Sequence, residues 1–266
     1  MPDIFDLIAR WWKRMFAVVF LSLLLVGVIT FLKPRKYLSV ATALPVSSLG
    51  SDKSKIFNDN IEVLYSALGS PDELDRIIGT ANLDTLYVAV TKQMDLFDHY
   101  KIKEQDDDAL IKTAALLKAN TKVIKSAYGE LQIKVWDTDK NLAPQLANTL
   151  MENLQAMHTD LQNAGNEAAL KGLMRAKQKI QAAYDTIPPS LQVGLQERLV
   201  EYEKLIAEYE LIVDIKPPVL AVTEKAKPAI RPDKPKRMQI MIATAVLSFL
   251  FALLAALAAE RRKNAV

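Results

Sequence analysis

The sequence of 266 residues contains no cysteine and only two histidines, His99 and His158. Without cysteine, the chain can form neither a disulfide nor a thiolate metal site. The histidines lie far apart and have no partner pattern around them, so neither is expected to be a catalytic base. The chain also lacks a glycine-rich phosphate loop and a Gly-x-Ser-x-Gly nucleophile elbow. We therefore predict that the protein is not an enzyme and uses no catalytic residue, cofactor or metal.

An excess of charge is also absent from the middle of the chain. The formal net charge of +3 lies in the two ends, with +1 before Met15 and +2 after Ala259, so residues 33–237 are neutral overall. The charged residues at the ends are Asp3, Asp6, Arg10, Lys13, Arg14, Glu260, Arg261, Arg262 and Lys263. Phosphate binding normally requires a basic surface, so nucleic acid is not expected as a partner.

What the sequence does contain is two long runs without a charged residue or a histidine, Met15–Leu32 and Met238–Ala259. Each run is long enough to cross the ~30 Å hydrocarbon core of a bilayer as a helix. The first could be a signal peptide, because basic residues precede it and Ala-x-Ala stands at 41–43. It is longer than the about 7–15 apolar residues of such a peptide, and three basic residues separate it from the triplet. We expect an uncleaved transmembrane helix.

Two spans place both tails on the same side of the membrane. Basic residues flank the first span on both sides, but long loops translocate largely regardless of charge, so we expect the loop outside and the tails inside. Trp11 and Trp12 either belong to an interfacial aromatic belt or merely extend the apolar stretch. The expected layout is a cytosolic tail at 1–14, a span at 15–32, one external domain at 33–237, a span at 238–259 and a cytosolic tail at 260–266.

Small residues recur at every fourth position of the second span. Small side chains on one face let two membrane helices approach closely. The stripe therefore predicts packing against the first span or against another subunit, unless it is only the alanine-rich composition common in such helices. Its members are Thr244, Ser248, Ala252 and Ala256.

Short helices and short strands are both expected within residues 33–237. Ser70, Pro71 and Glu73 make a good helix start, because they supply a cap, a first-turn proline and a capping box. The acidic residues Glu104 and Asp106–Asp108 are interpreted as the N-terminus of a second helix, favoured by its dipole, in preference to a cation site. The expected strands lie at 37–44, 121–126, 131–135 and 219–223, and the expected shorter helices at 70–79 and 106–119.

A long helix is expected from about 141 to 187, because apolar residues recur along it every three or four positions. Unbroken, it would measure ~67 Å. Pro188 and Pro189 end or bend it, and a second helix follows at about 189–213, either antiparallel to the first or continuing outward. A proline-rich segment at 217–235 then leads to the second span. The apolar stripe, which we propose as a subunit packing surface, consists of Leu142, Leu146, Leu150, Leu154, Met157 and Leu161.

Taken in chain order, these elements predict an α+β fold in a membrane protein. The strands lie near both membrane attachments in the sequence, and the long helices lie far from them. We expect a small mixed sheet near the membrane and a helical arm, of coiled-coil character, that projects away from the bilayer.

The residues just before the long helix partly match the pattern of a calcium-binding loop. Asp137, Asp139 and Asn141 occupy its first three ligand positions. The match fails, because the sixth position is Leu142 instead of glycine and the twelfth is Asn148 instead of glutamate. We interpret Asp139 or Asn141 as the cap of the long helix.

Four stretches of this sequence together resemble one known family. They are Asp3–Trp12 (DIFDLIARWW), Lys36–Thr42 (KYLSVAT), Leu131–Asn148 (LQIKVWDTDKNLAPQLAN) and Val219–Pro235 (VLAVTEKAKPAIRPDKP). In their order and spacing they resemble the polysaccharide co-polymerases, the Wzz-type chain-length determinants of bacterial inner membranes. Residues 50–120 match that family poorly, and Asn141 stands where the family often has proline.

The resemblance implies a periplasmic domain that assembles into a ring of identical subunits in the inner membrane. Such proteins regulate the chain length of O-antigen, capsule or exopolysaccharide beside a polymerase that elongates a lipid-linked glycan. Some members carry a cytosolic tyrosine kinase, which is not expected here. The alternatives are an export scaffold that works with a separate kinase or an outer-membrane exporter, and a two-span sensor that needs a cytosolic partner. A hydrolase is the least favoured class, because no nucleophile or carboxylate pair stands out.

Overall fold

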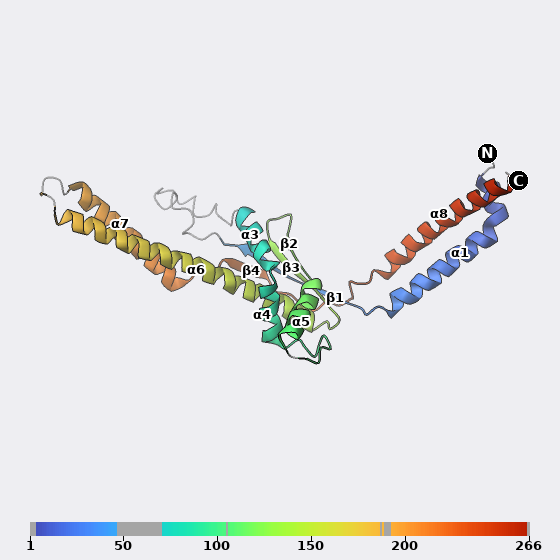
Figure 1. Ribbon diagram of the computed structural model, residues 1–266, viewed down its shortest axis with the longest axis horizontal. Coiled ribbons are helices and arrows are strands. Elements are labelled where there is room, and N and C mark those ends of the chain that lie inside the picture. The colour runs from blue at the N-terminus through green and yellow to red at the C-terminus, as the bar shows by residue number, and fades with distance from the viewer. Residues whose placement is uncertain (1–3, 47–70, 105, 187, 189–192, 265–266) are drawn as a thin grey trace. The chain divides into compact units, whose positions relative to one another are not determined.

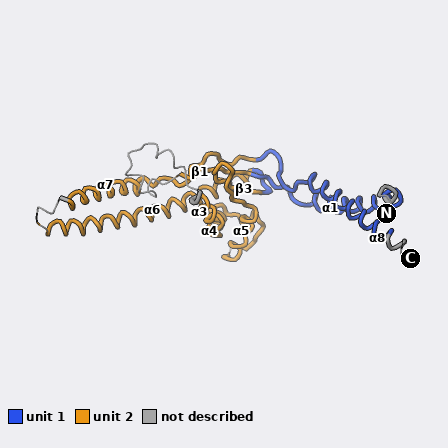
Figure 2. Tube along the Cα trace, turned by 90° about the horizontal axis from the view of Figure 1, so that it is seen from above, with its two compact units in different colours: residues 1–38, 137–140, 229–266 blue, residues 39–136, 141–228 orange. Residues whose placement is uncertain are grey.

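The computed structural model describes residues 4–46, 71–104, 106–186, 188 and 193–264. Within these ranges the chain is mostly helical, with a small sheet and one long apolar helix at each end (Figure 1). It divides into two compact units (Figure 2). Unit 1 comprises residues 1–38, 137–140 and 229–266, and unit 2 comprises residues 39–136 and 141–228.

Unit 1 is built on two apolar helices, α1 (Ile4–Leu32) and α8 (Arg237–Asn264), which pack against each other. Their segments Ile8–Leu32 and Arg237–Glu260 are long and apolar enough to cross a membrane, which agrees with the two predicted spans. Most of their apolar side chains are exposed in the isolated chain. Such an outer surface suits contact with lipid.

The sheet has four strands in the order β2-β3-β1-β4. Strand β1 pairs antiparallel with β4, and β2 pairs antiparallel with β3. The hairpin between β2 and β3 turns at Gly129, whose φ of 76° lies in the region that glycine adopts without strain. The strands are β1 (Tyr37–Pro45), β2 (Thr121–Lys125), β3 (Leu131–Asp137) and β4 (Leu220–Glu224), each within two residues of its expected bounds.

The core of unit 2 lies between one face of the sheet and the surrounding helices. Strand β3 alternates regularly, and its Leu131, Ile133 and Val135 are fully buried. They join one apolar cluster with buried residues from every helix of the unit except α7. Burial of these side chains is the main stabilising contribution to the fold. The helices of unit 2 are α3 (Pro71–Ala81), α4 (Asp84–Met94), α5 (Asp107–Ala119), α6 (Leu142–Tyr184) and α7 (Val193–Ile215).

The long helix is confirmed as one continuous element. Helix α6 has 43 residues, about 65 Å at 1.5 Å per residue. Gly165 and Gly172 do not interrupt it, and both are exposed. Helix α7 returns along α6 (Figures 1 and 2), which decides for the antiparallel alternative. Lys177 and Glu203 form an ion pair of 2.8 Å between them.

The helix starts were predicted unequally well. Asp106 caps α5, because its Oδ1 accepts from the backbone N of Ala109 at 2.7 Å. Asn141 precedes α6 with helical φ and ψ of −90° and −29° and makes no side-chain cap bond within the described residues, so the proposed Asn141 cap is wrong. The turn before α6 is instead closed by Asp137, whose Oδ1 accepts from the backbone N of Asp139 at 2.8 Å. The proposed Ser70 cap lies outside the described residues.

Helix α4 has no counterpart among the sequence-based expectations. Its first residue, Asp84, is preceded by Leu83, whose side chain cannot accept a hydrogen bond from the first turn. The usual start signal is therefore missing. The helix is held by burial of Leu86, Tyr87 and Val90 in the core.

Replacing Leu150 by alanine should reduce the free energy of unfolding by about 2–5 kcal/mol, because it leaves a cavity in the core. Thermal unfolding of the full chain in detergent, followed by circular dichroism, measures the change. Leu83→Ala removes the same atoms from an exposed position and is the matched control. Equal losses in both variants would mean that α6 is not packed on the sheet as described.

Candidate functional site

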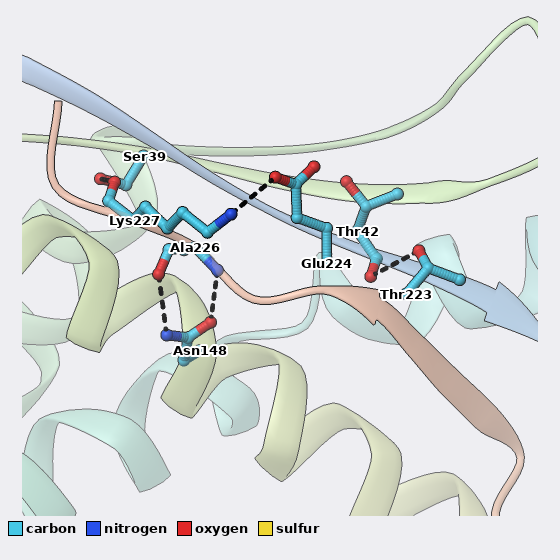
Figure 3. A network of polar contacts seen from close by, with 7 residues as sticks. All are labelled: Ser39, Thr42, Asn148, Thr223, Glu224, Ala226 and Lys227. Carbon is cyan, nitrogen blue, oxygen red and sulfur yellow. Dashed lines mark hydrogen bonds and ion pairs between the residues drawn. The ribbon is translucent and has the colours of Figure 1, made fainter.

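A single amide side chain connects α6 to the segment that follows β4. The Oδ1 of Asn148 accepts from the backbone N of Ala226 at 2.8 Å, and its Nδ2 donates to the Ala226 carbonyl at 3.3 Å (Figure 3). Both backbone groups of Ala226 are therefore paired by one residue of α6. We call this arrangement the Asn148 clamp.

Two further hydrogen bonds connect β4 and the segment after it to β1 (Figure 3). Ser39 donates from Oγ to the carbonyl of Lys227 at 2.9 Å, and Thr223 donates from Oγ1 to the carbonyl of Thr42 at 3.1 Å. Ser39 and Thr42 are both buried. Burying a polar group such as the Ser39 hydroxyl or the Thr42 carbonyl is costly unless the group has a hydrogen-bond partner.

The clamp lies where three of the four family-like stretches meet. Ser39 and Thr42 come from Lys36–Thr42, Asn148 closes Leu131–Asn148, and Thr223–Lys227 lie inside Val219–Pro235. The sequence resemblance picked out these stretches separately, without showing that they touch. Their contacts give a structural reason for residues of these types at these places.

An open polar groove borders the clamp. It is lined by residues of three strands, of the turn between β2 and β3 and of the segment after β4. Their side chains supply two carboxylates, an amide, two hydroxyl groups and an ammonium group. They are Thr42, Glu130, Gln132, Thr223, Glu224 and Lys227. Glu224 and Lys227 pair at 3.5 Å. Among the described residues, no group of three or more His, Cys, Asp or Glu side chains could hold a metal ion. The groove can form hydrogen bonds with a polar ligand.

The stripe proposed for subunit packing is divided between two environments. Leu146, Leu150 and Leu154 are fully buried in the core of unit 2, and Leu142 and Met157 pack against that core. Leu161, in contrast, is 64% exposed. The first part of the stripe thus folds one chain, and only its far end is open to a second copy.

The stripe proposed for span packing lies on the face of α8 that packs against α1. Ser248, Ala252 and Ala256 are buried, and Thr244 is half-buried. The hydroxyl groups of Thr244 and Ser248 donate to carbonyls of α8 itself, those of Ile240 and Ala245. Small side chains there allow the two helices to approach closely.

Glu260 extends the same four-residue spacing by one step and carries the polar contact between these helices. Its Oε1 lies 2.5 Å from Nη1 of Arg10, and its Oε2 accepts from Nε1 of Trp11 at 3.1 Å. The residue is only 7% exposed. The sequence analysis counted Glu260 as a tail charge and took Trp11 as either an interfacial residue or an extension of the apolar stretch, so it did not predict this contact.

Two titratable groups in unit 2 are perturbed by burial. Burial and the nearby Asp84 carboxylate raise the pKa of Tyr87 to about 12. Burial lowers the pKa of His158. Both side chains belong to helices that pack in the core, which explains their perturbation without a catalytic role.

No family model matches the chain, and no curated protein matches it. Among solved structures it is similar to a full-length bacterial polysaccharide co-polymerase, at 14% identity and a TM-score of 0.42, over 99% of this chain and 98% of that one. It is also similar to a fragment of WzzB, a polysaccharide co-polymerase from Salmonella Typhimurium, at 13% identity and a TM-score of 0.38, over 75% and 100% of the two chains. These structures bear the name of the family that the four sequence stretches resemble.

Replacing Asn148 by alanine should release the segment after β4, because both backbone groups of Ala226 lose their partner. The expected cost is about 1–3 kcal/mol of unfolding free energy. The backbone amide of Ala226 should also exchange faster, as measured by hydrogen–deuterium exchange and mass spectrometry. Gln145→Ala, an exposed position of the same helix, is the control and should leave that exchange unchanged. Unaltered exchange in Asn148→Ala would contradict the clamp.

Cysteine pairs can test whether the spans pack within one chain, because the natural sequence has no cysteine to interfere. Gly27 is suitable, since Sδ of Met241 lies 3.9 Å from where its Cβ would stand. After oxidation, Gly27→Cys/Met241→Cys should yield a disulfide between two peptides of one monomer, detected by mass spectrometry. Each single variant is a control. A band of dimer size from the pair would show packing between subunits instead.

Proposed function

We propose that this protein is a non-enzymatic co-polymerase of the bacterial inner membrane that regulates the chain length of a surface polysaccharide. The single observation that carries the proposal is the Asn148 clamp. Stretches that resemble the family at three separate places in the sequence meet there in one bonded joint. A chance resemblance of short segments gives no reason for such contacts.

The proposed membrane arrangement follows from unit 1. The helices α1 and α8 cross the inner membrane as a hairpin, with both termini cytosolic and residues 33–237 periplasmic. Ile8–Leu32 and Arg237–Glu260 have 25 and 24 residues, about 36–38 Å of helix, which is enough for the ~30 Å core with some tilt. The Glu260–Arg10–Trp11 contacts support pairing of the two helices in one chain.

The proposed assembly is a ring of identical subunits beside the polymerase, which elongates a lipid-linked O-antigen, capsule or exopolysaccharide chain. Exposed apolar side chains on both helices of the arm support it, because a contact with another subunit would remove them from water. They are Leu161, Met174, Val200, Leu211 and Ile215. Leu161 is the member of the original stripe that remains available for such a contact.

Deleting the gene should change the size distribution of a surface polysaccharide, and the intact gene should restore it. The distribution is read as a ladder on a gel. An unchanged ladder after deletion would refute the proposed function.

Leu161→Glu tests the proposed assembly in the same cells. A buried charge at a subunit contact is costly, so the purified full chain should lose subunits by light scattering in detergent and fail to restore the ladder. Ala156→Glu places the same charge at an exposed position on another side of α6, and this variant should behave like the natural chain. Identical particle masses for natural chain and Leu161→Glu would remove Leu161 from the proposed contact.

A further inference from the structure

The ends of the spans that lie away from the termini are strongly cationic. Residues 33–38 and 229–237 together hold seven lysines and arginines against the single carboxylate of Asp233. Because residues 33–237 are neutral overall, this positive charge is concentrated next to the spans. We call these residues the basic collar: Lys33, Arg35, Lys36, Arg231, Lys234, Lys236 and Arg237.

The two segments of the collar are held together by their backbones. The N–H of Lys36 donates to the carbonyl of Lys234 at 2.9 Å, and the N–H of Asp233 donates to the carbonyl of Lys36 at 2.9 Å. The positive charges of residues 33–38 and of residues 229–237 therefore lie on one surface. An open pocket of about 410 Å³ lies in it, lined by residues including Arg35, Lys236 and Arg237.

Four cations of the collar are free to meet an external anion. Lys33, Arg35, Arg231 and Lys236 are exposed, and no ion pair joins them to another described residue. Like charges gathered on one surface repel each other, and a bound anion relieves the repulsion. Phosphate groups suit lysine and arginine as partners.

Apolar groups adjoin the collar and point to the kind of anion. The guanidinium of Arg237 lies 4.4 Å from the ring centre of Phe31, which is itself exposed. Leu32, Ile230 and Met238 are exposed as well. A ligand that matches both properties has a phosphate group and long apolar chains, as a phospholipid does and free phosphate does not.

The collar also begins where the spans end. Lys33 directly follows Ile8–Leu32, and Arg237 opens the second span. In a bilayer these cations would stand at the level of the lipid headgroups, where long basic side chains reach phosphate while their stems stay in apolar surroundings.

We propose that the basic collar binds the headgroups of anionic phospholipids such as phosphatidylglycerol. The lipid phosphate neutralises Arg35 and Lys236, and the acyl chains lie against Phe31 and its apolar neighbours. This fixes the depth of the hairpin in the membrane at the end remote from the termini. The proposal rests on the two-span arrangement given under the proposed function.

Native mass spectrometry of the full chain in mild detergent tests this site. The chain is titrated with phosphatidylglycerol or with zwitterionic phosphatidylcholine, and the lipids retained are counted. The natural chain should prefer phosphatidylglycerol, and Arg35→Gln/Lys236→Gln should lower that preference by about tenfold. Lys171→Gln/Lys179→Gln removes the same charge from exposed positions of α6 and should leave it unchanged.

Arg35→Lys/Lys236→Arg keeps both charges and should retain the preference, which separates lost charge from lost folding. Equal retention of the two lipids by the natural chain would overturn the proposal. An equal loss in the α6 control would do the same. Displacement of phosphatidylglycerol by millimolar inorganic phosphate would show that phosphate alone is recognised and would refute a lipid site.

Alkaline extraction of membranes distinguishes this failure from failure of the proposed function. Release of the natural chain into the soluble fraction would contradict the two-span arrangement itself. A chain that stays in the membrane without preferring phosphatidylglycerol would refute the lipid site alone.

Discussion

The bond between the Asn148 amide and the backbone of Ala226 constrains how the chain enters and leaves unit 2. Strand β4 ends at Glu224, so the backbone N–H and carbonyl of Ala226 lie beyond the strand and need other hydrogen-bond partners. The Asn148 side chain of α6 provides both partners. Ser39 of β1 also bonds to Lys227, so β1 and the segment after β4 are held beside each other within unit 2. Loss of these partners would leave backbone groups unpaired, which is costly wherever water is excluded.

The same helix then serves a second purpose along its length. Most of the stability of a helix in a protein comes from packing of its apolar side, so α6, with 43 residues, is stabilised by partners along its length. Up to Met157 the partner is the sheet and its helices, and beyond that point it is α7. Two helices cover only one side of each other. Leu161 and Leu211 are therefore exposed on these two helices. The apolar surface that remains open to another subunit lies outside the core of unit 2.

The regular patterns of the sequence predicted most of the fold. Alternation of apolar and polar residues predicted β3, and apolar residues at every third or fourth position predicted α6. Each of these periods is typical of one kind of element. Helix α4 was missed, because Leu83 gives no cap signal and its stability comes from tertiary burial. The purpose of the stripe was also beyond the sequence: periodicity shows that Leu146 and Leu161 share a face, but not that the core covers only the first. The clamp joins Asn148 and Ala226 across 78 positions, and no local pattern reports such a contact.

A charged side chain is buried and paired at one end of the α1–α8 pair, and charged side chains are exposed at the other. At the end near the termini, Glu260 is buried and its carboxylate is paired with Arg10 and Trp11 of the other helix. A buried carboxylate without those partners would be strongly destabilising, so these contacts hold the helices together there. At the remote end, backbone hydrogen bonds of Lys36 join the segment after α1 to the segment before α8. The side chains of Arg35 and Lys236 are exposed there. Charge that is not needed to join the helices, and that lies beside exposed apolar groups, suits the lipid headgroup proposed as its ligand.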